Sequence, residues 1–185
     1  MSKNFELYLT EEVLVSISHL PMLMQTISTD TKQKNEIIVS KDQVDHHVFF
    51  VEKGLIRLFD IDEEGNEHTI LIIPENQMLF NVESCYFGRP SKYFVEAIEE
   101  TELILLGPKF KELANRLGNE FRNYNEFLLY TNLEKIHERI NVLISLNKSD
   151  KESYFSQKYK EIIDRIPDKV KDSFMGFKSH NHQVI

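Results

Sequence analysis

Short alternating apolar segments, separated by polar turns, constrain the fold of this chain more than any other feature. Each segment is only three to seven residues long and is rich in β-branched or aromatic residues, as strands are. No helical segment separates them, which excludes a parallel doubly wound sheet, because such sheets alternate strands with helices. The pattern therefore predicts an antiparallel sandwich or barrel with strands at 37–39, 48–51, 55–61, 68–73, 93–98 and 103–106.

Two connections in this region carry further information. Residues 62–67 read as a polar hairpin tip, in which Gly65 supplies the positive φ that such tips need. Residues 77–97 interrupt the strands with a compact polar and aromatic insertion around Cys85, Gly88 and Pro90. An insertion of this kind inside a sheet is where a small-molecule pocket would be built.

Helical periodicity flanks the strands on both sides. Residues 10–28 read as helix, capped by Thr10 and interrupted by Pro21. Residues 109–146 predict one long helix, whose apolar stripe either packs on its own β-domain or forms the seam of a dimer. We favour the dimer, because the stripe is longer than a short sheet needs to cover it. The stripe consists of Phe121, Tyr124, Leu128, Leu129, Leu133, Ile136, Ile140 and Leu143.

The remaining residues predict a small helical unit. Residues 147–153 read as a polar break, and residues 154–166 as a short helix. Pro167 and Asp168 start a further helix, which a turn at Gly176 follows. A last helix opened by Ser179 would complete a helix-turn-helix.

Composition excludes several classes of protein. The single cysteine, Cys85, excludes an intramolecular disulfide framework, an all-cysteine zinc site and a cysteine-held iron–sulfur cluster, and we interpret it as a packed apolar residue. The net charge of −8 argues against wholesale attraction to nucleic acid. We interpret His46, His47 and His68 as loop and strand-end residues, so no metal site is expected.

Function classes are narrowed by motifs that the sequence lacks. It has no nucleophile elbow, no phosphate-cradling glycine loop and no His-x-x-x-His pair, so we expect no enzyme. No apolar run approaches the ~20 residues that cross a bilayer, and the first residues lack a signal-peptide pattern. A cytoplasmic protein without a membrane partner is expected.

The order of these parts resembles the cyclic-AMP receptor protein/FNR (Crp/Fnr) family of bacterial regulators, and most closely its Bacteroidetes branch. The resemblance implies an α+β fold: an antiparallel cyclic-nucleotide-binding-like β-roll of jelly-roll type, a long dimerisation helix and a C-terminal winged-helix or helix-turn-helix unit. It also implies a homodimer that binds an effector in the roll and duplex DNA with its last helix. The corresponding domains are 1–108, 109–146 and 147–185. The resemblance rests on residues 48–59, 62–70, 88–106 and 165–177.

The effector insertion departs from the pattern of the family's cyclic-AMP binders. They carry a Gly-Glu pair and an Arg-Ser/Thr pair, whereas this sequence has Phe80-Asn81 and Ser91-Lys92 at those positions. Cyclic AMP is therefore not expected, since Lys does not reproduce the bidentate role of Arg toward a phosphate, and no other cofactor is assigned. Two alternatives remain open. The insertion binds a different small effector, for which the nearby cations favour an anion, or it binds no ligand at all. The candidate pocket residues are Phe80, Asn81, Val82, Glu83, Arg89, Ser91 and Lys92.

The DNA-reading segment departs as well. The family branch usually places an arginine-containing segment in the last helix, and the matching positions 182–185 hold no arginine. The resemblance therefore predicts a shortened or incomplete DNA-binding unit, and the alternative is a ligand-binding or interaction module that has lost DNA binding. Candidate contacts to phosphates or base edges are Lys169, Lys171, Lys178, Ser179, His180, Asn181, His182 and Gln183.

Overall fold

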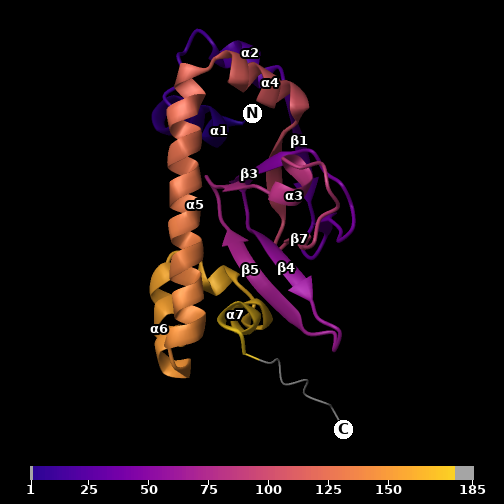
Figure 1. Cartoon of the computed structure of the whole chain (residues 1–185), viewed down its shortest axis with the longest axis vertical. Coiled ribbons are helices and arrows are strands. Elements are labelled where there is room, and N and C mark those ends of the chain that lie inside the picture. The colour runs from indigo at the N-terminus through magenta and orange to yellow at the C-terminus, as the bar shows by residue number, and fades with distance from the viewer. Residues whose placement is uncertain (1, 178–185) are drawn as a thin grey trace.

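A computed structural model describes residues 2–177, apart from the side chains of 119, 120, 123–125, 127, 128 and 131. Two four-stranded antiparallel sheets form a β-roll, and a long helix runs beside the roll to a helical unit at its far end (Figure 1). The strand orders are β1-β8-β3-β6 and β2-β7-β4-β5. The predicted antiparallel β-fold is thus confirmed.

The strands lie close to their predicted positions. The hairpin between β4 and β5 has Gly65 at its tip with φ 83°, as predicted. Two strands are absent from the prediction: β1, because the apolar spacing assigns Ile27 to a helix, and the two-residue β6, which lies within the predicted insertion. The strands are β1 Ile27–Lys32, β2 Ile37–Val39, β3 Val48–Lys53, β4 Ile56–Ile61, β5 Glu67–Ile73, β6 Met78–Leu79, β7 Phe94–Ala97 and β8 Thr101–Leu106.

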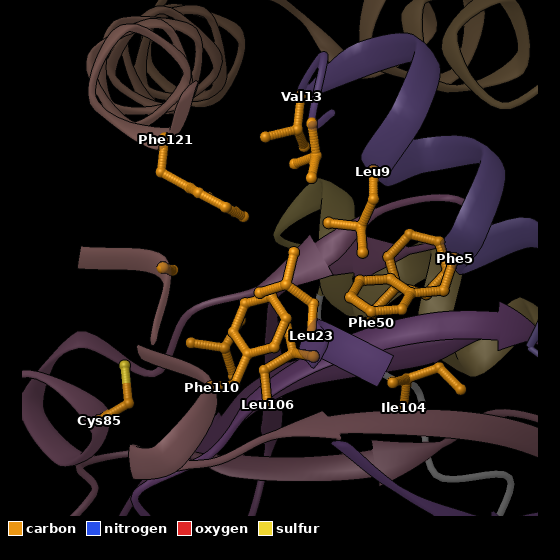
Figure 2. Packing of buried hydrophobic residues seen from close by; sticks show 13 residues of the cluster. Phe5, Leu9, Val13, Leu23, Phe50, Cys85, Ile104, Leu106, Phe110 and Phe121 are labelled. Carbon is orange, nitrogen blue, oxygen red and sulfur yellow. The ribbon is translucent and has the colours of Figure 1, made fainter. Parts of the chain in front are cut away.

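The central strands of the first sheet are buried on both faces. In β3, Phe49 and Val51 point between the two sheets, whereas Val48 and Phe50 point into a second apolar cluster on the outer face. Alternation of side chains along a strand explains this division, and the outer cluster exists because helices cover that face. Residues of the N-terminal segment, of helix α4 (Pro108–Arg116) and of helix α5 (Asn119–Ser145) meet there (Figure 2).

The N-terminal helices differ from the prediction for residues 10–28. They are α1 Lys3–Leu7, the π-helix η1 Tyr8–Glu12 and α2 Leu20–Met24. Thr10 does not cap a helix, because its hydroxyl donates to the carbonyls of Glu6 and Leu7 within the helical segment. The apolar residues whose spacing suggested one helix belong to several short elements, which pack over the roll.

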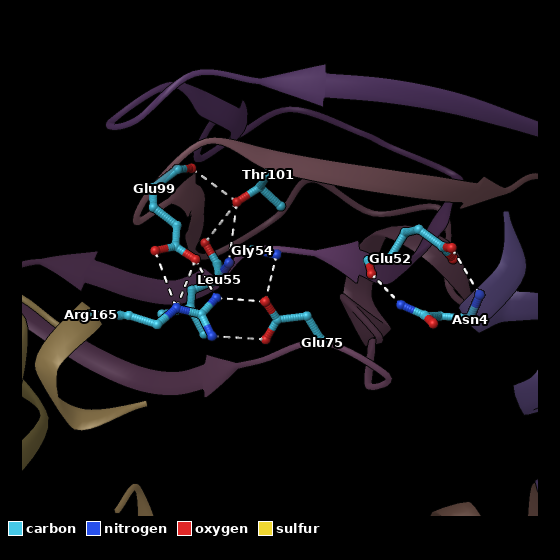
Figure 3. A network of polar contacts seen from close by, with 8 residues as sticks. All are labelled: Asn4, Glu52, Gly54, Leu55, Glu75, Glu99, Thr101 and Arg165. Carbon is cyan, nitrogen blue, oxygen red and sulfur yellow. Dashed lines mark hydrogen bonds and ion pairs between the residues drawn. The ribbon is translucent and has the colours of Figure 1, made fainter. Parts of the chain in front are cut away.

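A buried carboxylate fixes the start of α1 to strand β3. Glu52 accepts backbone N–H groups of Asn4 at 2.9 Å and Phe5 at 3.0 Å, and Asn4 Nδ2 donates to the Glu52 carbonyl (Figure 3). Negative charge beside the free N–H groups of a helix start is favourable. The N-terminal segment is thereby held against the roll by polar contacts as well as by its apolar side chains.

The predicted helix over 109–146 is two helices. They are α4 Pro108–Arg116 and α5 Asn119–Ser145, separated at Gly118, which has φ 45° and ψ −80°. An L side chain is strained at such a positive φ, whereas glycine is not. The break lets α4 pack across the roll while α5 runs along it (Figure 1).

The first helix of the C-terminal unit begins earlier than predicted. The supposed polar break at 147–153 is the start of α6, whose Asn147 cap accepts the backbone N–H of Asp150. Helix α7 starts at Asp168 as predicted, and the predicted last helix lies outside the described residues. The elements are α6 Lys148–Lys158, the 3-10 turn η2 Ile163–Arg165 and α7 Asp168–Met175.

This unit is docked firmly on the roll. Phe155, Val170 and Phe174 are buried together with Leu55 and Ile72 of the roll in one apolar cluster. At the edge of this cluster, Arg165 forms ion pairs with Glu75 and Glu99 (Figure 3). The roll and the C-terminal unit therefore share a core.

Candidate functional site

The insertion between β6 and β7 is centred on a short helix, α3 Val82–Cys85. Asn81 and Ser91 flank it, and both are almost fully buried. Asn81 Nδ2 donates to Ser91 Oγ at 2.7 Å, and Ser91 Oγ donates to the carbonyl of Tyr93 at 2.6 Å. These contacts close the insertion on itself, because the polar groups in its centre bind one another.

One acceptor in this centre has no partner. Asn81 Oδ1 is buried without a hydrogen bond among the described residues. Phe80, the preceding residue, packs against the apolar cluster beneath α4. The positions at which the family resemblance predicts a Gly-Glu pair therefore carry an aromatic ring and an amide.

The cations of the insertion lie at its rim. Lys92 Nζ is 3.5 Å from Glu83 Oε1, and the Arg89 guanidinium lies 5.2 Å from the centre of the exposed Phe87 ring. Val82 is exposed as well. The structure therefore brings Asn81 and Ser91 together, but it does not bring Arg89 and Lys92 to them.

Cys85 is buried in the apolar cluster beneath α4, His46 and His47 lie in the loop before β3, and His68 lies near the start of β5. Burial raises the pKa of the Cys85 thiol, which disfavours the reactive thiolate. His47 Nδ1 lies 2.8 Å from Asp45, and His68 Nε2 lies 2.8 Å from Asp62; the hydrogen bond from His68 holds the pKa of the Asp62 carboxyl well below its usual range. Within residues 2–177, no three His, Cys, Asp or Glu residues gather as a metal site would require.

A second surface lies along α5. Five residues of the predicted stripe present an exposed apolar column, whereas Phe121 is buried against Phe110 in the outer cluster of the roll. Phe121 therefore does not belong to the exposed stripe, because the helix break at Gly118 turns it inward. The side chains of Tyr124 and Leu128 lie outside the described residues. The exposed fractions are 67% for Leu129, 47% for Leu133, 49% for Ile136, 48% for Ile140 and 38% for Leu143.

The predicted DNA contacts that the structure describes are engaged within the chain. Lys169 of α7 forms an ion pair with Glu67 of β5, and Lys171 lies 3.0 Å from Asp168. Glu67 also lies 2.7 Å from the buried Arg57 guanidinium; burial alone would raise the pKa of the Glu67 carboxyl, but its two cationic partners hold it below its usual value. The other candidates, Lys178 to Gln183, lie outside the described residues.

Sequence reasoning missed one residue that joins three elements. Arg139 of α5 stacks on Phe174 of α7 at 3.6 Å from the ring centre, and it donates to the carbonyls of Phe174 and Thr69, the latter at 2.9 Å. A cation beside the apolar stripe, three residues after Ile136 and four before Leu143, was the available signal. Its partners are far away in the sequence, so nothing in the pattern pointed to them.

Comparison with known proteins first defines the class of domain. Residues 30–116, which run from β1 to the end of α4, match the family model of the cyclic nucleotide-binding domain. The chain therefore carries a domain of this class. No curated protein matches the sequence significantly.

Solved structures with the same fold include transcriptional regulators of the Crp/Fnr family. FixK2 of Bradyrhizobium japonicum is 13% identical, with 82% of this chain and 78% of that chain covered and a TM-score of 0.71. A Crp/Fnr-family transcriptional regulator of Thermus thermophilus is 19% identical, with 81% and 79% covered and a TM-score of 0.58. The catabolite activator protein of the same organism is 17% identical, with 92% and 80% covered and a TM-score of 0.59.

These matches confirm the resemblance to the Crp/Fnr family at the level of the fold. Assignment to its Bacteroidetes branch stays a prediction, as does the shortened C-terminal winged-helix or helix-turn-helix unit. Among the described helices, none is both long and apolar enough to cross a membrane.

Proposed function

We propose that this protein is a Crp/Fnr-type transcriptional regulator that works in the cytoplasm as a homodimer. The observation that carries the proposal is the exposed apolar column on α5, from Leu129 to Leu143. It extends about 20 Å along the helix at 1.5 Å per residue and follows the heptad spacing of a two-helix seam. A regulator that works as a homodimer needs an exposed apolar column of this kind, beside its cyclic nucleotide-binding domain, to pair its two protomers.

The remaining parts have roles in the same mechanism. The insertion at residues 80–92 would sense a small ligand other than cyclic AMP, because Phe80 and Asn81 replace the residues that hold a nucleotide. The C-terminal unit would present its last helix to duplex DNA in two copies related by a two-fold axis. Ligand binding would change DNA affinity by altering how that unit is held.

Dimerisation is tested by placing a charge in the column. The variant Leu133→Asp/Ile140→Asp should sediment as a monomer at concentrations at which the wild type is a dimer, because two buried carboxylates would face their copies across the seam. Glu134→Gln, an exposed position on the same helix, should leave the dimer intact. A monomeric wild type at 100 times the working concentration would contradict the dimer.

DNA binding is tested with the full chain and duplexes of random sequence at two salt concentrations. A regulator should bind with a negative log–log salt slope of several units, because each neutralised phosphate releases counterions. Absence of binding at low salt would reject the regulator and support the second candidate function.

The second candidate is a ligand-binding or protein-interaction module of the same fold. A specific observation favours it: the described cations of α7 that would contact phosphates, Lys169 and Lys171, are paired with Glu67 and Asp168. A module of this kind would dimerise through α5 but show no salt-dependent affinity for DNA.

A further inference from the structure

A cleft lies where the roll, α5 and the C-terminal unit meet. Its volume is about 520 Å³, within the range of pockets that hold small organic ligands. One wall is the end of β5 and the following turn, and the others are the middle of α5 and the end of α6 with the turn after it. No residue of the predicted pocket at 80–92 lines this cleft.

The lining carries more positive than negative charge. Its cations are Lys135, Arg139, Lys158 and Lys160, and its carboxylates are Glu75 and Glu161. Glu75 is already paired with Arg165 outside the cleft. Lys158 is likewise paired, with Glu138 at 2.6 Å. Lys135, Arg139 and Lys160 then stand against Glu161, which leaves a surplus of two positive charges, close to the charge of a phosphate monoester at pH 7.

Arg139 supplies an unused donor in the cleft wall. Its Nη2 is engaged by the carbonyls of Thr69 and Phe174, but its Nη1 is buried without a hydrogen bond among the described residues. A buried donor without a partner costs about 1–3 kcal/mol, and an unseen ion or water is a recognised explanation for one. Burial also lowers the pKa of Arg139 to about 10.

Lys135 lies one helical turn before Arg139, so both side chains project from the same side of α5. Its ammonium group makes no ion pair or hydrogen bond with another described residue. Solvent reaches this group, but its partial burial between the walls of the cleft lowers the pKa of Lys135. The nearby charge of Lys158 lowers that pKa further. An anion placed between Lys135 and Arg139 would offset both effects.

We propose that this cleft binds a small phosphate-bearing metabolite, whose phosphate accepts hydrogen bonds from Arg139 Nη1 and Lys135 Nζ. Arg139 is suited to the role because its planar fork can hold an oxyanion on one edge while the other edge stays on protein carbonyls. The same guanidinium contacts α7 through Phe174. The ligand therefore fastens α7 to α5 and the roll, and its concentration sets how firmly the C-terminal unit is docked.

The experiment titrates the full chain with inorganic phosphate and with glucose 6-phosphate, and uses chloride at matched ionic strength as the reference. Binding is followed by calorimetry and by the thermal midpoint. Saturable binding of either phosphate probe is expected in the wild type and in Lys34→Gln, a matched loss of an exposed lysine on the roll. Lys135→Gln should bind at least tenfold more weakly, because one charge-assisted contact is lost.

Two further readouts separate binding from a structural role. Lys135→Gln should keep the wild-type thermal midpoint when phosphate is absent, and phosphate should slow amide exchange in α7 of the wild type. Arg139→Lys keeps the charge but loses the fork, so it should also weaken binding. No saturable binding of either probe, or equal affinity in Lys135→Gln and the wild type, would overturn the proposal. It needs neither a dimer nor DNA, so its failure is distinct from failure of the proposed function.

Discussion

The predicted pocket at residues 80–92 and the cleft beside Arg139 are two polar sites with opposite organisation. In the pocket, Asn81 and Ser91 use each other as partners and the cations stay at the rim. In the cleft, cations from α5 and α6 converge and Arg139 keeps a buried donor unused. Each site holds one buried polar atom without a partner among the described residues, Asn81 Oδ1 in the pocket and Arg139 Nη1 in the cleft. The difference teaches that resemblance to a ligand-binding insertion locates a site, whereas cations that converge on an unpaired buried donor indicate where an anion is needed.

The largest effect should come from the wall of the cleft. Phe174→Ala is expected to lower the free energy of unfolding by about 3–5 kcal/mol, the usual range for truncating a buried aromatic side chain. Phe174 is 2% exposed and packs against Phe155, Tyr159 and Arg139. Urea titration followed by circular dichroism measures the change, and it suits a chain that has no tryptophan.

The control comes from the other site. Phe87→Ala removes a ring that is 62% exposed at the rim of the predicted pocket, so it should change stability by less than about 0.5 kcal/mol. Equal losses in the two variants would mean that α7 is not docked through Phe174.

The hydrogen bond between Asn81 and Ser91 in the centre of the predicted pocket gives the next largest expected effect on stability. Ser91→Ala should cost about 1–3 kcal/mol, because it leaves the buried Asn81 amide without its acceptor. In a double-mutant cycle, Asn81→Ala/Ser91→Ala should cost less than the sum of the single changes. Strict additivity, measured by the same urea titrations, would show that the hydrogen bond between them contributes nothing. Ser40→Ala, in an exposed turn, is the matched control.

A smaller effect is expected where Arg165 joins the C-terminal unit to the roll. Burial alone would raise the pKa of the Glu75 carboxyl, but hydrogen bonds from Arg165 hold that pKa below its ordinary value of 4.5. A lowered carboxyl pKa gives stability that is fully present above about pH 4.5 and is lost as the pH falls through the lowered value. The partly exposed pair should contribute at most about 1 kcal/mol.

Arg165→Gln tests this origin of the pH dependence. The variant should be slightly less stable than the wild type at pH 7, and the difference should shrink between pH 4.5 and pH 3, since acid removes the same interaction from the wild type. Urea midpoints at both pH values measure it. A difference that grows on acidification would assign the pH dependence to other groups.

The smallest expected response is that to cyclic AMP. Calorimetry should detect no saturable binding up to about 1 mM, a concentration that corresponds to only about −4 kcal/mol of binding free energy. The physical reasons are the Phe80 ring at a glycine position and the absence of an arginine beside Ser91. Saturable binding that is lost in Ser91→Ala but kept in Lys135→Gln would place the nucleotide in the predicted pocket and reverse the comparison.

Local patterns predicted most of the roll. Alternation of apolar residues located every predicted strand, and a glycine in a polar tip located the β4–β5 hairpin. Errors arose where tertiary contacts overruled spacing. Thr10 has the chemistry of a cap but lies inside a helical segment, and Phe121 continues the apolar stripe but turns into the roll after Gly118. Asn147 caps α6 inside a stretch that is polar enough to read as a break.

The two sites were predictable to different degrees. The insertion at 80–92 could be found because its residues are contiguous and its length is that of the family's insertion. The cleft could not, because Thr69, Arg139 and Phe174 come from three elements and only the fold brings them together. No local sequence pattern predicts that Arg139 donates to the backbone carbonyls of Thr69 in β5 and Phe174 in α7.

The strand pairing of the roll has a consequence for how the chain is made. Among the described strands, β1 pairs only with β8 and β2 only with β7. The second sheet therefore cannot be completed before Ala97 has left the ribosome, and the first not before Leu106. At roughly 5–20 residues per second, β1 waits on the order of 4 to 16 s for its partner, with its backbone edge unpaired. A nascent chain paused just before β8 would therefore be a substrate for chaperones, whereas one paused just after it could already close its roll.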